Sequence, residues 1–157
     1  ERKVKEGDTL PEFQIMSTIG KEKTNEDFIG NATLFFIYSK NDTNSCTKEA
    51  KSFSDAKQKF LDLGIKIYGV SKDTIESHKK FKTKHALDIE LLSDSKLHFI
   101  TAIGAWVEKS MYGKKYMGVE RTTILVTKSG KIWKIWKKVR VPRHVQEVLN
   151  FLEQEEI

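Results

Sequence analysis

The sequence predicts an α/β protein with a central mixed β-sheet flanked by helices. Short apolar runs typical of buried strands alternate with segments whose apolar residues recur every three to four positions, as in amphipathic helices. The last two strand candidates are separated only by a short turn, which makes that pair antiparallel and the sheet mixed. Hydrophobic residues make up 38% of the 157 positions and charged residues 32%, which suffices for a packed core.

The N-terminal part of the chain supplies the first strand and the first long helix. Residues 7–13 have turn character followed by a short β-like stretch, and residues 25–28 indicate a brief helical turn. The apolar, aromatic-rich run at 33–38 predicts a strand that is buried on both faces. From Cys46 onward, apolar residues at helical spacing predict a helix with one buried face, which Gly64 ends.

The rest of the chain continues this alternation. Residues 65–70 predict a second strand, Asp73 or Thr74 could cap a helix that runs toward His85, and residues 90–92 predict a short strand. The remaining expected elements are a helix through Leu97 and Ile100, an irregular segment at 104–118, hairpin strands at 122–126 and 131–136 around a turn at 128–130, and an amphipathic helix at 144–153. This order suits a thioredoxin-like fold.

Composition excludes several classes of protein. No repeat and no Pro/Gly/Ser-rich linker divides the chain, so we expect residues 1–157 to form a single domain. The longest nearly unbroken apolar run, residues 32–38, is far shorter than the ~20 residues that a membrane span needs. No charged-then-apolar signal segment opens the chain, and we therefore expect a cytoplasmic protein that does not act at a membrane.

The excess of basic residues permits an anionic partner without requiring one. Lysine and arginine number 28 and aspartate and glutamate 22, which gives a formal charge of +6. Residues 131–140 mix aromatic and basic side chains, as a nucleic-acid or membrane-surface patch would. The simpler interpretation is a sheet strand followed by a lysine-rich flank, and we expect no nucleic-acid partner.

Two of the four histidines, His78 and His85, are candidate metal ligands. His78 and His85 lie seven residues apart on an expected helix and could share one face, but no further ligands stand at suitable spacing. We therefore expect no metal. His98 and His144 are interpreted as surface or helix-cap residues.

The single cysteine, Cys46, is the residue with the clearest chemical potential. One cysteine excludes an intramolecular disulfide and a Cys-rich zinc site within this sequence. Cys46 follows a polar loop and stands at the start of a helix, where free backbone N–H groups and the positive end of the helix dipole stabilise a thiolate. The alternative is a small apolar residue packed into the first turn, and position alone does not decide between the two.

The surrounding sequence resembles a known family. The segment FFIYSKNDTNSCTKEA at 35–50 resembles the active-site segment of the peroxiredoxins, in particular the peroxiredoxin Q group, also called bacterioferritin comigratory proteins. The similarity extends along nearly the whole chain, at residues 69–73, 77–81, 91–94, 106–114 and 118–123. It implies a thioredoxin-like fold and a thiol-dependent peroxidase that reduces hydrogen peroxide and organic hydroperoxides through a cysteine sulfenic acid, with no metal or organic cofactor.

The resemblance also implies roles for individual residues. Cys46 matches the peroxidatic cysteine, and Thr43 matches the threonine whose hydroxyl contacts the thiolate and the peroxide. Arg121 matches the arginine that reaches the site from a later strand. Glu49 matches a carboxylate that orients the polar groups of the site, although an exposed helix glutamate is an alternative interpretation.

Three departures from the family pattern affect the expected mechanism. Ser39 stands where these proteins usually have a proline that shapes the peroxide pocket, and Asn44 and Ser45 replace the usual Pro-Gly. Lys51 stands where many members carry a second, resolving cysteine. We therefore expect a one-cysteine enzyme reduced by an external thiol such as thioredoxin, glutaredoxin or a small thiol, and the resemblance implies a monomer. The competing hypothesis is a non-catalytic binding or chaperone module on the same fold.

Overall fold

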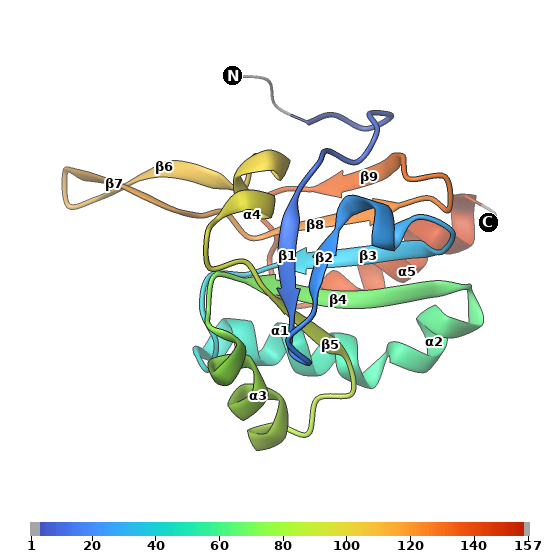
Figure 1. Cartoon of the computed structure of the whole chain (residues 1–157), viewed down its shortest axis with the longest axis horizontal. Coiled ribbons are helices and arrows are strands. Elements are labelled where there is room, and N and C mark those ends of the chain that lie inside the picture. Colours follow the sequence, from blue (N-terminus) through green and yellow to red (C-terminus); the bar gives the residue numbers. More distant parts are fainter. Residues whose placement is uncertain (1–3, 156–157) are drawn as a thin grey trace.

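A seven-stranded mixed β-sheet runs through the centre of the protein (Figure 1). The computed structural model describes residues 4–155. Along the sheet the strands follow the order β2-β1-β5-β4-β3-β8-β9, with β3, β4 and β5 parallel and the outer strands antiparallel to their neighbours. The strands are β1 (Gln14–Ser17), β2 (Glu22–Thr24), β3 (Ala32–Ile37), β4 (Ile65–Ser71), β5 (Glu90–Ser93), β8 (Thr122–Val126) and β9 (Ile132–Trp136).

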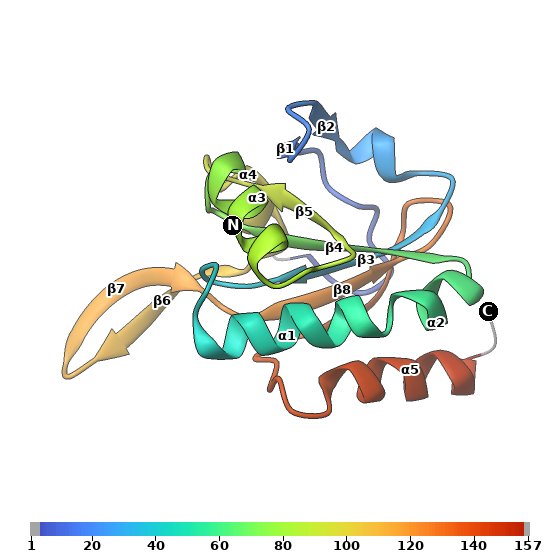
Figure 2. The same ribbon diagram turned by 90° about the horizontal axis from the view of Figure 1, so that it is seen from below.

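Helices cover both faces of this sheet. They are the 3₁₀ helix η1 (Asn25–Phe28), α1 (Asn44–Asp55), α2 (Lys57–Asp62), α3 (Ile75–Lys84), α4 (His98–Ile103) and α5 (His144–Glu155). Figure 2 shows α1, α2 and α5 side by side on one face. The α4 helix contributes to the apolar cluster on the opposite face. Within the described residues, no helix is long and apolar enough to cross a membrane.

The central strand β3 is buried along its whole length, as the apolar run predicted. Its side chains alternate between the two faces of the sheet. Leu34 and Phe36 enter the apolar cluster shared with α1, α2 and α5, whereas Phe35 and Ile37 enter the cluster shared with α4. Because both faces are covered, β3 and the loop after it are held firmly where the site is built.

The expectation of an irregular segment at 104–118 is wrong. Strands β6 (Trp106–Met111) and β7 (Lys114–Val119) form an antiparallel ribbon that projects from the body of the molecule (Figures 1 and 2). Tyr112 and Gly113 have φ angles of 52° and 79°, which are typical of the tight turn of a two-residue hairpin. Because most of the ribbon is not packed into a core, its sequence lacks the clean apolar alternation that reveals a buried strand.

Three smaller differences concern element boundaries. The β1–β2 hairpin lies just beyond the β-like stretch predicted at residues 7–13. The long helix begins at Asn44, two residues earlier than expected, and Ala56 separates it into α1 and α2. The expected helical turn at 25–28, the cap at Thr74 and the hairpin of β8 and β9 are confirmed.

Gly69 in β4 is a position where packing requires glycine. A Cβ atom there would lie 2.7 Å from a ring carbon of Phe36 and 2.8 Å from a methyl carbon of Leu91. We therefore expect Gly69→Ala to lower the free energy of unfolding by about 1–3 kcal/mol through overpacking. Denaturant titration measures the change. Gly118→Ala is the control, because its added methyl would first meet the Lys109 side chain. Equal stability of the two variants would contradict this prediction.

Candidate active site

Cys46 lies in the first turn of α1, directly beyond the end of β3. Residues 39–43 lead from the strand into the helix, and Thr43 occupies the N-cap position. Backbone N–H groups in a first helical turn have no intrahelical acceptor, so they are available to an anion. The Cys46 side chain has no exposed surface, and the thiol is free. The sulfur is therefore enclosed among polar groups.

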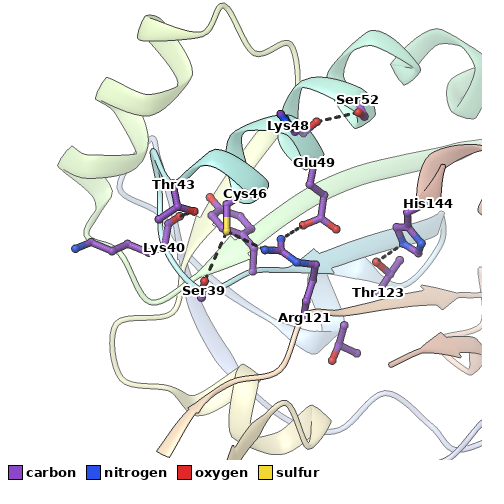
Figure 3. Close-up of polar contacts among 12 residues, drawn as sticks. Ser39, Lys40, Thr43, Cys46, Lys48, Glu49, Ser52, Arg121, Thr123 and His144 are labelled. Atoms are coloured by element: carbon purple, nitrogen blue, oxygen red, sulfur yellow. Dashed lines mark hydrogen bonds and ion pairs between the residues drawn. The ribbon is translucent and has the colours of Figure 1, made fainter. Parts of the chain in front are cut away.

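Arg121 and Glu49 form a buried ion pair beside the sulfur (Figure 3). One guanidinium nitrogen of Arg121, Nη1, donates to Glu49 Oε1 at 2.6 Å, and the other, Nη2, lies 3.3 Å from Cys46 Sγ. Arg121 comes from the segment between β7 and β8, whereas Glu49 follows Cys46 by about one helical turn. Glu49 is only 1% exposed, so the alternative of an exposed helix glutamate is wrong.

Two hydroxyl groups of the β3–α1 loop complete the surroundings of the thiol. The Ser39 hydroxyl lies 3.6 Å from Cys46 Sγ. The Thr43 hydroxyl donates to the Lys40 carbonyl at 3.2 Å and caps no backbone N–H of α1. To donate to the thiolate, this hydroxyl turns its single proton from the Lys40 carbonyl to the sulfur. The structure thus brings all four residues singled out from the sequence together and adds Ser39, which the sequence analysis had treated only as the loss of a proline.

The polar neighbours of Cys46 favour its thiolate. Burial raises the pKa of the Cys46 thiol, but hydrogen bonds from Thr43, the Lys40 backbone, Ser39 and Arg121 together outweigh that effect. The net result is a pKa below the usual value of a cysteine. A depressed thiol pKa at an enclosed site is typical of a reactive cysteine.

Glu49 carries the opposite shift. Burial raises its pKa to about 7, although the charge and the hydrogen bond of Arg121 act to lower it. Its second oxygen, Oε2, is buried and has no hydrogen-bond partner within residues 4–155. Oε1 therefore accepts the hydrogen bond from Arg121. Oε2 has no donor within residues 4–155 to stabilise a negative charge, which disfavours the ionised carboxylate.

A buried hydrogen-bond network anchors the loop that carries Ser39 and Thr43. Tyr38 donates its hydroxyl proton to Asn41 Oδ1 at 2.6 Å, and the backbone N–H of Asn41 donates to Asp73 at 2.9 Å. His78 is fully buried, with Nδ1 3.1 Å from the Asn41 side-chain nitrogen, and burial lowers its pKa to about 4. His85 instead lies 2.9 Å from Asp42. His78 and His85 therefore contact different residues and do not form one shared site.

The aromatic side chains of the aromatic and basic segment at residues 131–140 pack against α5. Trp133 and Trp136 of β9 pack edge-on against Phe151 of α5, as expected for a sheet strand. His144, expected at the surface or at a helix cap, is the first residue of α5 but is buried, and its Nε2 lies 2.8 Å from the Thr123 hydroxyl of β8. Burial lowers the pKa of His144. This contact holds α5 against the strand that follows Arg121.

Comparison with known proteins identifies the family. Residues 7–135 match the AhpC/TSA family. Peroxiredoxin Bcp of Bacillus subtilis is 38% identical over 146 residues, which cover 93% of each chain, and that of Escherichia coli is 32% identical over 151 residues, covering 96% of this chain and 97% of the relative. The chain belongs to the AhpC/TSA family and is a peroxiredoxin of the Bcp type.

Solved structures agree with this assignment. Peroxiredoxin Q of Xanthomonas campestris superimposes with a TM-score of 0.86 at 32% identity, covering 90% of each chain. A cysteine-to-serine mutant of PrxQ from Xylella fastidiosa gives 0.91 at 29% identity over the whole of both chains. The expected thioredoxin-like α/β fold is confirmed, and the protein is a thiol-dependent peroxidase.

Ser39 supplies the first prediction for the site. We expect Ser39→Ala to raise the pKa of the Cys46 thiol and to slow its oxidation at neutral pH by a few-fold, because one donor to the thiolate is lost. A pH titration of the thiolate ultraviolet absorbance measures the pKa. Ser45→Ala, at an exposed neighbour in the same helical turn, is the matched control. An unchanged titration of Ser39→Ala would show that this hydroxyl does not stabilise the thiolate.

Glu49 gives a prediction about stability and pH. Its pKa is raised from the unfolded value of 4.5 to about 7, so the native state holds the proton more tightly than the unfolded state. The stabilisation from this proton is fully present below pH 4.5 and is lost as the pH rises through about 7. Denaturant titrations should therefore show the unfolding free energy of the wild type falling, relative to that of Glu49→Gln, across this range. A constant difference between the two would contradict the raised pKa.

Proposed function

We propose that Cys46 is the peroxidatic nucleophile, that Thr43 and Arg121 bind the peroxide and stabilise the reacting oxygens, and that Glu49 positions Arg121. The observation that carries this proposal is the placement of one guanidinium between a buried carboxylate and the cysteine sulfur, at 2.6 Å and 3.3 Å respectively. An arginine needed only for charge would not require both contacts. The rigid fork fixes the direction in which its remaining N–H groups point.

The reaction at this site is a displacement on oxygen. The Cys46 thiolate attacks the terminal oxygen of the peroxide, so an S–O bond forms while the O–O bond breaks. Cys46 becomes a sulfenic acid, and the departing oxygen leaves as hydroxide or alkoxide and takes up a proton. Negative charge thus moves from sulfur to the departing oxygen, close to the Arg121 guanidinium, the Thr43 hydroxyl and the Cys46 backbone N–H.

Lowering the thiol pKa is not sufficient to make a fast peroxidase. A free cysteine with a pKa of ~8.5 is already about 3% ionised at pH 7, so complete ionisation gains only about 30-fold, and nucleophilicity falls as the pKa falls. Fixed donors aimed at developing charge in a dry site contribute about 3 kcal/mol each. The burial of Glu49, together with an Arg121 side chain that is only 18% exposed, supports this larger contribution.

The return half of the cycle uses a thiol from outside the chain. The 157 residues contain one cysteine, so they offer no second sulfur to form an intramolecular disulfide with the oxidised Cys46. We propose that an external thiol, supplied by thioredoxin, by glutaredoxin or as a small molecule, reduces the sulfenic acid. We also propose that residues 1–157 act as one monomeric domain in the cytoplasm, without a nucleic-acid partner.

The peroxide substrate is proposed to include organic hydroperoxides as well as hydrogen peroxide. A solved structure of the bacterioferritin comigratory protein of Xanthomonas campestris, 30% identical to this chain, is described in terms of its alkyl peroxide reduction activity. The shared fold and the same family support a similar range here.

The role of Arg121 is tested with the variants Arg121→Ala and Arg121→Lys. At a pH where Cys46 is fully ionised in every protein, we expect Arg121→Ala to be oxidised by hydrogen peroxide about 100-fold more slowly than the wild type. Arg121→Lys keeps the charge but loses the planar fork, so it should recover only part of the rate. Stopped-flow measurement under single-turnover conditions gives the rates, and thiolate absorbance gives the ionisation.

Two results would contradict the proposed roles of Arg121 and Cys46. If the loss of rate in Arg121→Ala disappears once the thiol is fully ionised, the arginine acts only on the thiol pKa, and its proposed contact with the departing oxygen is wrong. If the native wild-type thiol reacts no faster than the thiol of the unfolded protein, Cys46 is not the peroxidatic nucleophile.

A further inference from the structure

A strongly basic loop borders the site but takes no part in the peroxide chemistry described above. It joins β9 to α5 and consists of residues 137–143, KKVRVPR, here named the basic loop. Its four cationic side chains, Lys137, Lys138, Arg140 and Arg143, are in exposed residues. None of them forms an ion pair with an acidic side chain in the part of the chain described, residues 4–155. Their charges are therefore available to a ligand.

The basic loop is fixed against the catalytic arginine. The backbone N–H of Val139 donates to the carbonyl oxygen of Arg121 at 3.0 Å. Lys138 and Arg143, at the two ends of the bend, adopt left-handed φ angles of 50° and 67°. Figure 2 shows the segment that leads into α5 passing beside the first turns of α1, which contain Cys46. The cations thus have a defined place next to the site.

A cleft of about 770 Å³ separates the β6–β7 ribbon from the basic loop, and Arg121 forms part of its wall. The charged residues that line it are Lys109, Arg121, Lys137, Lys138, Glu108 and Glu120. Glu108 lies 4.0 Å from Lys115, and Arg121 is paired with Glu49. The lysines of the cleft therefore leave it with a net positive character, and its volume lies in the range of small-molecule sites.

A second hollow continues this surface toward the sulfur. It has a volume of about 480 Å³ and is lined by Ser45, Arg121 and residues 139–142, including Arg140. Ser45 is exposed and immediately precedes Cys46 in the helix. Cationic groups therefore follow a continuous path from the ribbon to the residue beside the buried thiol.

We propose that this basic cleft binds the carboxylate groups of a small anionic thiol, and that this thiol is the reductant of oxidised Cys46. The inference rests on the proposed function, because it concerns the return half of the same reaction. Lys137, Lys138 and Arg140 hold the anionic groups, and the thiol of the ligand points toward the first turn of α1. The volume of the cleft, about 770 Å³, suits a small-molecule reductant, and the second hollow leads to Ser45, which immediately precedes Cys46.

The reduction proceeds in two balanced steps. The thiolate of the first small molecule attacks the sulfur of the Cys46 sulfenic acid, so an S–S bond forms, the S–O bond breaks, and hydroxide leaves as water after taking up a proton. A second thiolate then attacks the sulfur of the bound small molecule in the mixed disulfide. This releases the Cys46 thiolate and one symmetrical disulfide, so two thiols are oxidised for each peroxide reduced.

The experiment first oxidises Cys46 with one equivalent of hydrogen peroxide and then follows its reduction by three probe thiols. Mercaptosuccinate carries two carboxylates, mercaptoethanol is neutral and cysteamine is cationic. Each rate is divided by the rate of the same thiol with a small disulfide, which removes differences in intrinsic nucleophilicity. We expect mercaptosuccinate to exceed mercaptoethanol by about tenfold on this scale, cysteamine to be slowest, and the preference to shrink as salt is added.

A double variant tests whether Lys137 and Lys138 cause the preference for mercaptosuccinate. We expect Lys137→Gln with Lys138→Gln to lower the ratio of the mercaptosuccinate to the mercaptoethanol rate about five- to tenfold. The matched control is Lys128→Gln with Lys131→Gln, which removes the same charge from exposed residues around the turn at the far end of the same hairpin. The control should keep the wild-type ratio. Equal falls in both double variants would mean that only the net charge matters and would overturn the site.

The remaining outcomes separate this inference from the function on which it depends. Rapid formation of the sulfenic acid followed by reduction rates that ignore thiol charge would overturn the anionic reductant alone. Reduction by thioredoxin but by none of the small thiols would do the same in favour of a protein partner. Failure of the native protein to form a sulfenic acid at Cys46 would overturn the proposed function and the inference together.

Discussion

The buried ion pair between Glu49 and Arg121 is the interaction on which the site depends. It joins two segments 72 residues apart, the first helix after β3 and the turn before β8, and the cysteine sulfur lies at the end of the same guanidinium. The Glu49 side chain is 1% exposed and that of Arg121 18%, so the carboxylate loses most of its hydration and would be strongly destabilising without its partner. The pair is tolerated because each member neutralises the other, and their mutual contact fixes the direction of the remaining N–H groups.

The rest of the fold supports this arrangement from both sides. Strand β3, buried on both faces, ends at the loop that carries Ser39 and Thr43, and the Tyr38–Asn41–Asp73 hydrogen bonds hold that loop from the opposite side of the helix. His144 ties α5 to β8 just beyond Arg121. The thiol therefore lies between two rigid supports, and its hydrogen-bond donors need little reorganisation when charge moves to an oxygen.

Ser39, at the position where the family resemblance implies a proline, affects the chemistry of the pocket as well as its shape. A proline has no donor to offer, whereas the Ser39 hydroxyl lies 3.6 Å from the sulfur. An additional hydroxyl offsets part of the penalty of burying a thiolate. The chain thus combines a modified pocket with a single cysteine. Its 157 residues therefore offer no second cysteine that could reduce the oxidised sulfur. The cations of the basic loop form no ion pair within residues 4–155, and Arg140 lines a hollow together with Ser45, the residue before Cys46, so this surface can attract an anion close to the site.

The sequence by itself determined the fold class and the buried central strand, because both follow from apolar periodicity, and family resemblance singled out Cys46 as the proposed nucleophile. It also indicated Arg121 and Thr43 through family resemblance. Only the tertiary structure decided that Glu49 is buried, that Ser39 faces the sulfur, that residues 104–118 form a ribbon, and that the basic loop adjoins the site. The periodicity of apolar residues indicates which side chains become buried. It does not indicate contacts between segments far apart in the chain, such as Glu49 and Arg121, because these form only once the sheet has brought the segments together.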